Sequence, residues 1–219
     1  MRTSTRILLE VGLVFIAVIG VCRLLYEFRS IPFISQTLPL WAAVLFLYLP
    51  LIFLYLTKTK PELWGITLNN WSLGLKATVI ISILTLPSFV VVYRFYQQWW
   101  LHISSPAGLS FTTGWAMLLL YHLLCVAFPE EVFYRGYMQS RLNQIFPKRF
   151  RFFGAPLGIS VLLTTILFAL GHFIVQETWN SLATFVPGLV FGWLRERTGS
   201  ILASTLYHAL CNGTILLLN

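Results

Sequence analysis

Two adjacent glutamates, Glu130 and Glu131, interrupt an otherwise apolar stretch of the chain and are followed by Arg135. Residues four apart on a helix share a face, so Glu131 and Arg135 are expected to form an ion pair. A carboxylate bound to a guanidinium is a weak base, which makes the unpaired Glu130 the candidate general base and Glu131 its supporting partner. The alternative interpretation is that both glutamates anchor a helix end at a surface.

Two histidines with polar or aromatic neighbours follow later in the chain, in Phe168-x-x-x-His172 and His208-x-x-x-Asn212. A glutamate beside His172 can hold and deprotonate a water molecule. His208 and Asn212 can donate hydrogen bonds to the oxyanion formed when that water attacks a carbonyl. This combination predicts hydrolysis of an amide bond by Glu130 and His172 without a covalent enzyme intermediate.

Other chemistry is less well supported by the sequence. The chain contains no aspartate, which excludes an aspartyl dyad and a Ser-His-Asp triad. Glutamate and histidine also bind zinc, so metal-assisted hydrolysis is the competing mechanism. The His-Glu-x-x-His pattern is missing, however, and we therefore expect neither a metal nor another cofactor. Ser204 and Cys211 lie within one turn of His208, but Ser204 is expected to bond its own backbone and Cys211 to be a small buried hydrophobe, like Cys22 and Cys125.

The composition requires that these residues be positioned within a membrane. Of the 219 residues, 58% are hydrophobic and 10% charged, and the mean hydropathy is +0.79, which excludes an ordinary soluble domain. The basic residues behind the net charge of +8 flank apolar runs, so membrane lipids are expected partners and nucleic acid is not. The amide hydrolysis predicted above adds a peptide or protein substrate, with or without a lipid. The sequence predicts one all-α membrane domain over residues 1–219, a polytopic bundle of about seven transmembrane helices: Ile7–Leu25, Leu38–Leu56, Ala77–Tyr93, a run starting near Trp115, Leu157–Val175, Leu182–Leu194 and Ile201–Leu218.

The depth of the glutamates depends on where the fourth helix ends. It could end at Pro129, which would leave both glutamates at the surface. Alternatively it continues through Leu142, a span of about 30 residues and roughly 45 Å. We favour the long helix, because it brings Glu130 to about the same depth as His172 on the next one.

The basic residues of the short loops predict the orientation. With a cytoplasmic N-terminus, twelve basic residues lie inside (Arg2, Arg6, Lys58, Lys60, Lys76, Arg135, Arg141, Lys148, Arg149, Arg151, Arg195, Arg197) and three outside (Arg23, Arg29, Arg94). The protein is therefore expected to be an integral multi-pass membrane protein with a cytoplasmic N-terminus. The stretch Tyr96–His102 is expected to form an aromatic belt at the interface or to begin a re-entrant helix.

The three polar motifs, in this order and on successive late helices, resemble those of the CPBP family, also called the ABI family. That family comprises CAAX prenyl endopeptidases of the Ras-converting type and bacterial relatives associated with bacteriocin processing. The resemblance covers residues 115–219 and implies a glutamate-type intramembrane endopeptidase of the bacterial type, in a bacterial inner membrane. It implies that Glu130 and His172 activate the water and that His208 and Asn212 stabilise the oxyanion. Glu131, Arg135 and Phe168 are implied to support these residues.

Two other classes of function stay open at this stage. A peptide-binding membrane scaffold or bacteriocin self-immunity protein could use the same polar groups without cutting. A small transporter or proton relay could use them as a chain of titratable groups. Transporters of this kind often have internal repeats, and none is visible in this sequence.

Overall fold

The computed structural model describes residues 3–99, 102–103 and 114–218, which fold almost entirely into helices. Seven helical rods are present in these ranges, which confirms the predicted all-α bundle. Five of them are long and apolar enough to cross a membrane, whereas the last two are shorter. The rods are α1 (Thr3–Glu27), α2 (Pro32–Thr57), α3 (Trp71–Trp99), a composite fourth rod (Trp115–Asn143), α7 (Ile159–Gln176), α8 (Phe185–Thr198) and α9 (Leu202–Leu218).

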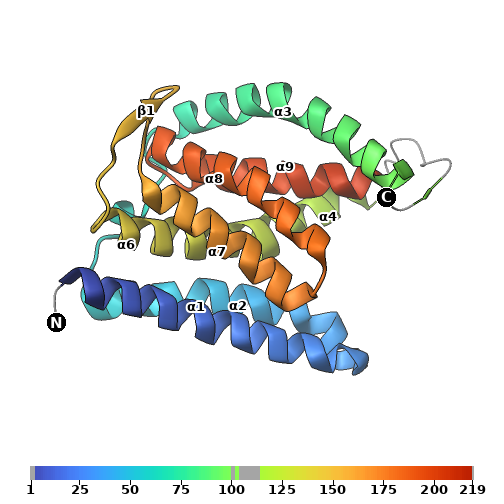
Figure 1. Cartoon of the computed structure of the whole chain (residues 1–219), viewed down its shortest axis with the longest axis horizontal. Coiled ribbons are helices and arrows are strands. Elements are labelled where there is room, and N and C mark those ends of the chain that lie inside the picture. The colour runs from blue at the N-terminus through green and yellow to red at the C-terminus, as the bar shows by residue number, and fades with distance from the viewer. Residues whose placement is uncertain (1–2, 100–101, 104–113, 219) are drawn as a thin grey trace.

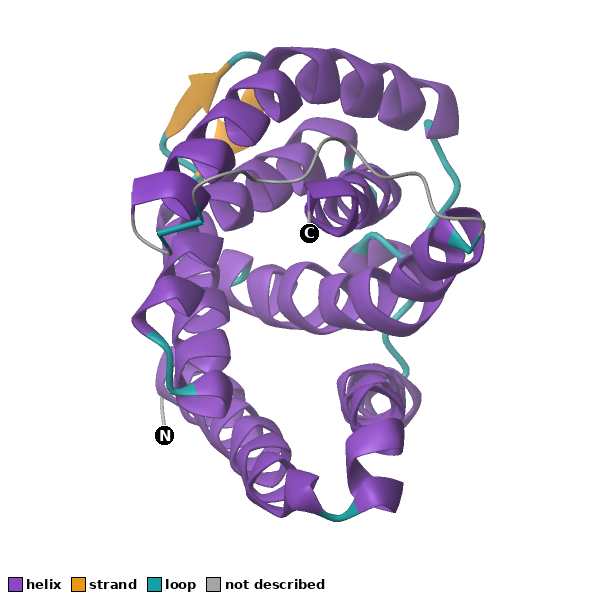
Figure 2. Cartoon of the chain, turned by 90° about the vertical axis from the view of Figure 1, so that its right-hand side faces the viewer, coloured by secondary structure: helices purple, strands orange, loops and turns teal. Residues whose placement is uncertain are grey.

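The rods run side by side in layers (Figures 1 and 2). The α1–α2 pair packs on one side of the fourth rod and α7, and α3 and α9 pack together on the other side. Short 3₁₀ turns connect several rods, at Phe28–Ser30, Pro61–Trp64 and Trp179–Thr184. The arrangement brings the three helices that carry the polar motifs together in the middle of the bundle.

The fourth rod continues past Pro129, as the long-helix interpretation predicted. It consists of α4 (Trp115–Tyr121), a π-helical segment (His122–Ala127), α5 (Phe128–Glu131), a second π-helical segment (Val132–Met138) and α6 (Gln139–Asn143). Proline lacks the N–H that a regular α-turn needs, and the wider turns on either side of α5 let the rod pass this residue without ending. Such wide turns are rare and often found at functional sites.

A small β-hairpin joins the fourth rod to α7 and was not expected from the sequence. Strands β1 (Phe150–Phe152) and β2 (Ala155–Leu157) pair antiparallel, with Phe150 opposite Leu157. The predicted fifth helix therefore begins at Ile159 and not at Leu157. Three-residue strands are too short to give an alternating hydrophobic pattern, which explains why the sequence did not reveal them.

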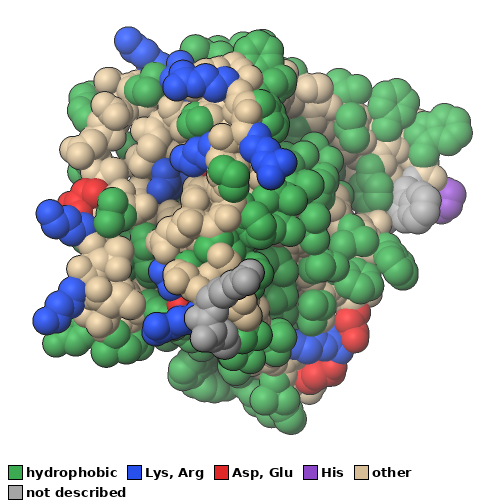
Figure 3. Space-filling view, turned by 60° about the vertical axis from the view of Figure 1, so that its left-hand side comes forward, with side chains coloured by type: hydrophobic (Ala, Val, Ile, Leu, Met, Phe, Trp, Pro, Cys, Tyr) green, Lys and Arg blue, Asp and Glu red, His purple; other side chains and the backbone are tan. Residues whose placement is uncertain are grey.

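The basic residues gather at one end of the bundle, where α2 and α8 end and α3 and α9 begin. Figure 3, turned so that this end comes forward, shows Lys and Arg side chains spread over it. Arg135 was wrongly counted among these loop charges, because it is fully buried within the fourth rod. At the opposite end, α3 extends to Trp99, and the two residues that follow, 100–101, lie outside the described part of the chain.

Glu10 is a charged residue inside the apolar helix α1, and it pairs with the fourth rod. Its two carboxylate oxygens accept hydrogen bonds from Arg141, at 2.8 Å from Nε and 2.5 Å from Nη2, and Oε1 also accepts from the Tyr137 hydroxyl. A bidentate arginine–carboxylate pair of this kind is stronger than a neutral hydrogen bond. It holds the start of α1 against α6.

We expect Glu10→Gln to lower the free energy of unfolding by about 1–2 kcal/mol, because a charge-assisted pair that is mostly buried is lost. Glu27→Gln is the matched control, since Glu27 is also on α1 and also bonded to an arginine, Arg23, but has a side chain 53% exposed. That change should cost no more than about 0.5 kcal/mol. Unfolding of the two variants in detergent micelles measures the difference, and equal losses would show that the Glu10 pair contributes no more than a surface pair.

Candidate active site

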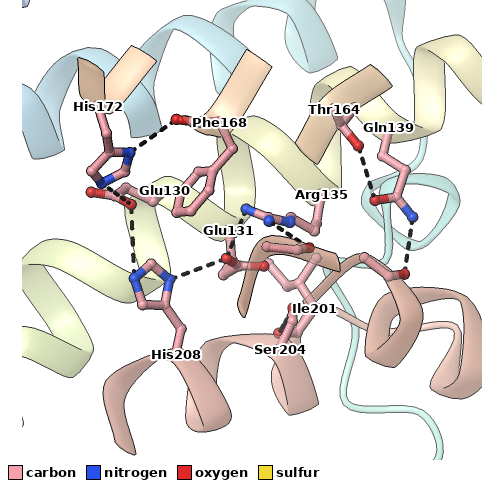
Figure 4. Close-up of polar contacts among 12 residues, drawn as sticks. Glu130, Glu131, Arg135, Gln139, Thr164, Phe168, His172, Ile201, Ser204 and His208 are labelled. Carbon is pink, nitrogen blue, oxygen red and sulfur yellow. Dashed lines mark hydrogen bonds and ion pairs between the residues drawn. The ribbon is translucent and has the colours of Figure 1, made fainter. Parts of the chain in front are cut away.

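Glu130 and the two motif histidines, from three different rods, converge in the interior of the bundle (Figure 4). Oε2 of Glu130 lies 4.0 Å from Nε2 of His172 on α7 and 3.8 Å from Nε2 of His208 on α9. Both separations are longer than a hydrogen bond. A water molecule or a substrate atom can bridge polar groups at such distances.

Glu131 lies beside this group and is bonded to two cationic or polar partners. Its Oε1 accepts hydrogen bonds from Nη1 of Arg135, at 3.1 Å, and from Nδ1 of His208, also at 3.1 Å. The predicted ion pair one turn apart is therefore present, and both of its side chains are fully buried. A carboxylate so engaged holds the ring of His208 in place.

The two glutamates differ in access. The side chains of Glu130 and His172 are 13% and 21% exposed, whereas those of Glu131 and Arg135 are inaccessible. Only the first pair therefore has side-chain atoms at the accessible surface, although Oε2 of Glu130 itself is buried. The two glutamates to which the helical spacing assigned different roles therefore differ in access, and the roles themselves stay predictions.

Hydrogen bonds fix which ring nitrogens carry a proton. Nδ1 of His172 lies 3.0 Å from the carbonyl oxygen of Phe168, which can only accept, so Nδ1 donates and Nε2 of the neutral ring presents a lone pair. Nδ1 of His208 donates in the same way to the ionised Glu131. Both histidines thus direct Nε2 toward Glu130.

Aromatic rings enclose the site on the side of Arg135. The ring of Phe191, on α8, stacks on His208 at a centroid distance of 4.5 Å and an interplanar angle of 16°. Phe168 meets His172 edge to face at 4.5 Å, and the Arg135 guanidinium lies over the Phe168 ring, 4.5 Å from its centroid. These contacts set the planes of the histidines and give the buried cation favourable cation–π partners.

Helix α8 supplies contacts that the sequence analysis missed. The Gly188 carbonyl oxygen accepts a hydrogen bond of 3.1 Å from Nη2 of Arg135. A Cβ at Gly188 would lie 3.1–3.4 Å from Thr165, Phe168 and Arg135, so the close approach of α8 requires a glycine here. Gly188 and Gly192, four residues apart, form the small-residue pattern of closely packed membrane helices, which was the available signal.

Three other motif or neighbouring residues lie on α9. Asn212 is half-buried, and the structure gives its side chain no hydrogen bond to the other site residues among the described ranges. Ser204 donates to the Ile201 carbonyl at 2.9 Å, which confirms the expected bond to its own backbone. Cys211 is buried and free, as is Cys22, while the free Cys125 is only half-buried.

A multi-pass helical bundle with carboxylate and imidazole groups gathered in its interior has the architecture of a membrane-embedded hydrolase. Comparison with protein families gives a match over residues 112–214 to the family described as type II CAAX prenyl endopeptidase Rce1-like. This part of the chain, which contains the whole polar cluster, is similar to the CAAX protease family, and the match supports a membrane protein of endopeptidase type. Comparisons with curated proteins and with solved structures gave no match.

Proposed function

We propose that the protein is an intramembrane endopeptidase in which Glu130 and His172 activate the water that hydrolyses a peptide bond. The observation that carries the proposal is the position of Oε2 of Glu130 between two imidazole Nε2 atoms, at 3.8 and 4.0 Å. This oxygen is buried and has no hydrogen-bond partner among the described residues. A water there could donate one proton to Glu130 and the other to His172, leaving a lone pair for a substrate carbonyl.

In the proposed reaction, Glu130 takes a proton from the water as its oxygen bonds to the carbonyl carbon. The C–N bond then breaks, and the proton passes from Glu130 to the departing amine nitrogen, so that one water is consumed for one new carboxyl and one new amine. His172 orients the water through Nε2, because its other nitrogen is bonded to the Phe168 carbonyl. The step needs no covalent enzyme intermediate.

His208 and Asn212 have the proposed role of stabilising the oxyanion. With Nδ1 donating to Glu131, His208 can donate from Nε2 only as the imidazolium. Asn212 lies one turn further along the same helix and would add a second donor once substrate is bound.

The proposed substrate is a peptide or protein segment that reaches the site from the membrane. The description of the matched family makes a prenylated C-terminal peptide the first substrate to test. A bacteriocin precursor, which the resemblance of the motifs to those of bacterial relatives implies, is the second. We further propose that the N-terminus is cytoplasmic and the membrane a bacterial inner membrane, in agreement with the basic residues at the end where α2 and α8 end.

Mapping of new protein termini in native membranes tests the function and reveals the substrate class together. Membranes containing the wild-type chain are compared with membranes containing Glu130→Gln at matched expression. We expect a set of cut sites that is present only with the wild type. Identical termini, together with a biological effect retained by Glu130→Gln, would instead support a peptide-binding scaffold or self-immunity protein.

A further inference from the structure

The β-hairpin at the basic end of the bundle combines exposed aromatic rings with arginines. Phe150, Phe152 and Phe153 are 59%, 53% and 79% exposed, although the chain around them leaves the membrane-spanning rods. Alternation along β1 places Phe150 and Phe152 on one face and Arg151 on the other. Apolar and cationic groups thus occupy separate faces of one short element.

Arg149 and Arg151, the cations of the hairpin, differ from the neighbouring Lys148 because they form no ion pair in the described part of the chain. Lys148 is bonded to Glu196 on α8 at 2.6 Å. Burial alone would raise the pKa of Glu196, but hydrogen bonds from Lys148, Gln139 and Asn143 outweigh it and lower the pKa. Arg149 and Arg151 are exposed, and neither forms an ion pair with any residue in the described ranges.

The hairpin is fixed to the bundle, and not merely appended to it. Nε1 of Trp193, on α8, donates to the Phe152 carbonyl oxygen at 2.9 Å. At the turn, the backbone of Gly154 has φ +79°, and a Cβ there would lie 3.0 Å from Nε of Arg197. A third cation, Arg197, which is distant in sequence, therefore lies against the turn of this hairpin.

We propose that this hairpin is a binding site for anionic phospholipid headgroups of the surrounding membrane. Aromatic side chains favour the interface between hydrocarbon and headgroups. Each cation near the membrane surface strengthens binding to an anionic leaflet about fivefold relative to a neutral one. An acidic protein would match the arginines but not three exposed phenylalanines beside membrane-spanning rods. The inference does not depend on the proposed peptidase reaction.

The lipids retained by the purified full-length chain test the site. The protein is extracted from membranes of equal phosphatidylglycerol and phosphatidylcholine content, and the ratio of the two bound lipids is measured by mass spectrometry. We expect enrichment of phosphatidylglycerol, reduced at least about fivefold in the variant Arg149→Gln/Arg151→Gln. The control Lys58→Gln/Lys60→Gln removes the same charge from an exposed loop at the same end but outside the hairpin, and should keep the enrichment.

Backbone hydrogen exchange of residues 148–157 in nanodiscs gives a second readout that is independent of extraction. We expect exchange in the wild type to be several-fold slower in phosphatidylglycerol nanodiscs than in phosphatidylcholine nanodiscs, and Arg149→Gln/Arg151→Gln to remove the difference. Equal lipid ratios in the hairpin variant and the wild type, or an equal loss in the lysine control, would overturn the proposal. So would exchange that is insensitive to the lipid.

Discussion

Glu130→Gln is expected to lower the rate of peptide hydrolysis by about 10³-fold while the protein still folds and inserts, because general acid–base groups contribute 10²–10⁴-fold. The amide has the shape of the carboxylate but cannot accept a proton from water. Its neighbours would be little disturbed, since Oε2 of Glu130 has no direct hydrogen bond to break among the described residues. The measurement is the initial rate on a peptide spanning a cut site, with purified protein in detergent or nanodiscs.

Glu177→Gln is the matched control for this rate, because the same atoms change on a glutamate whose side chain is 67% exposed and bonded to Arg23. It should retain wild-type activity. Retained activity in Glu130→Gln would contradict the mechanism. Loss of wild-type activity with phenanthroline, restored by zinc, would favour the metal-assisted alternative, since the proposed reaction is indifferent to chelators.

Arg135→Met is expected to lower the free energy of unfolding by about 3–5 kcal/mol, because it leaves the fully buried Glu131 without its arginine. Glu131→Leu should cost a similar amount by leaving the arginine unpaired. Replacing both residues, in Glu131→Leu/Arg135→Met, removes both charges together and should recover much of the loss. Equilibrium unfolding of the three variants in micelles measures these differences.

The double variant also separates stability from activity. His208 loses the carboxylate that fixes its ring, so Glu131→Leu/Arg135→Met should be folded but inactive. If instead each single variant unfolded within about 1 kcal/mol of the wild type, the buried pair would have no more effect than a surface ion pair. A double variant with full activity would exclude the proposed orientation of His208 by Glu131.

Much of the architecture could be predicted from local properties of the sequence. The seven rods follow from apolar runs, and the pairing of Glu131 with Arg135 follows from spacing within one helix. The contact between His208 and Glu131 joins residues 77 positions apart, and spacing within a helix cannot specify which rods adjoin. The motifs therefore named residues that the fold brings together, but neither the distances between them nor the absence of a hydrogen bond from Asn212 to the others in the described ranges.

The features that were missed depend on packing between elements. Phe191 stacks on His208 because α8 approaches closely at Gly188. Neither Phe191 nor Gly188 belongs to a polar motif. Arg135 was wrongly assigned to a loop because residue type alone does not distinguish two cases. A basic residue near an expected helix end can lie at the surface, or it can be buried beside an acidic partner. The roles assigned to Glu130, His172, His208 and Asn212 remain predictions for the variants described above.

The π-helical segments on either side of Glu130 and Glu131 make the site depend on the winding of the helix as well as on residue identity. A π-turn contains about one residue more than an α-turn, so regular α-winding of the same residues in the first segment would rotate every later side chain of the rod by about 100° relative to the residues before it. Glu130 would then face away from the histidines although no residue had changed. Removal of one residue from that segment would instead offset the lost wide turn, so a single-codon deletion there would leave the later side chains in phase.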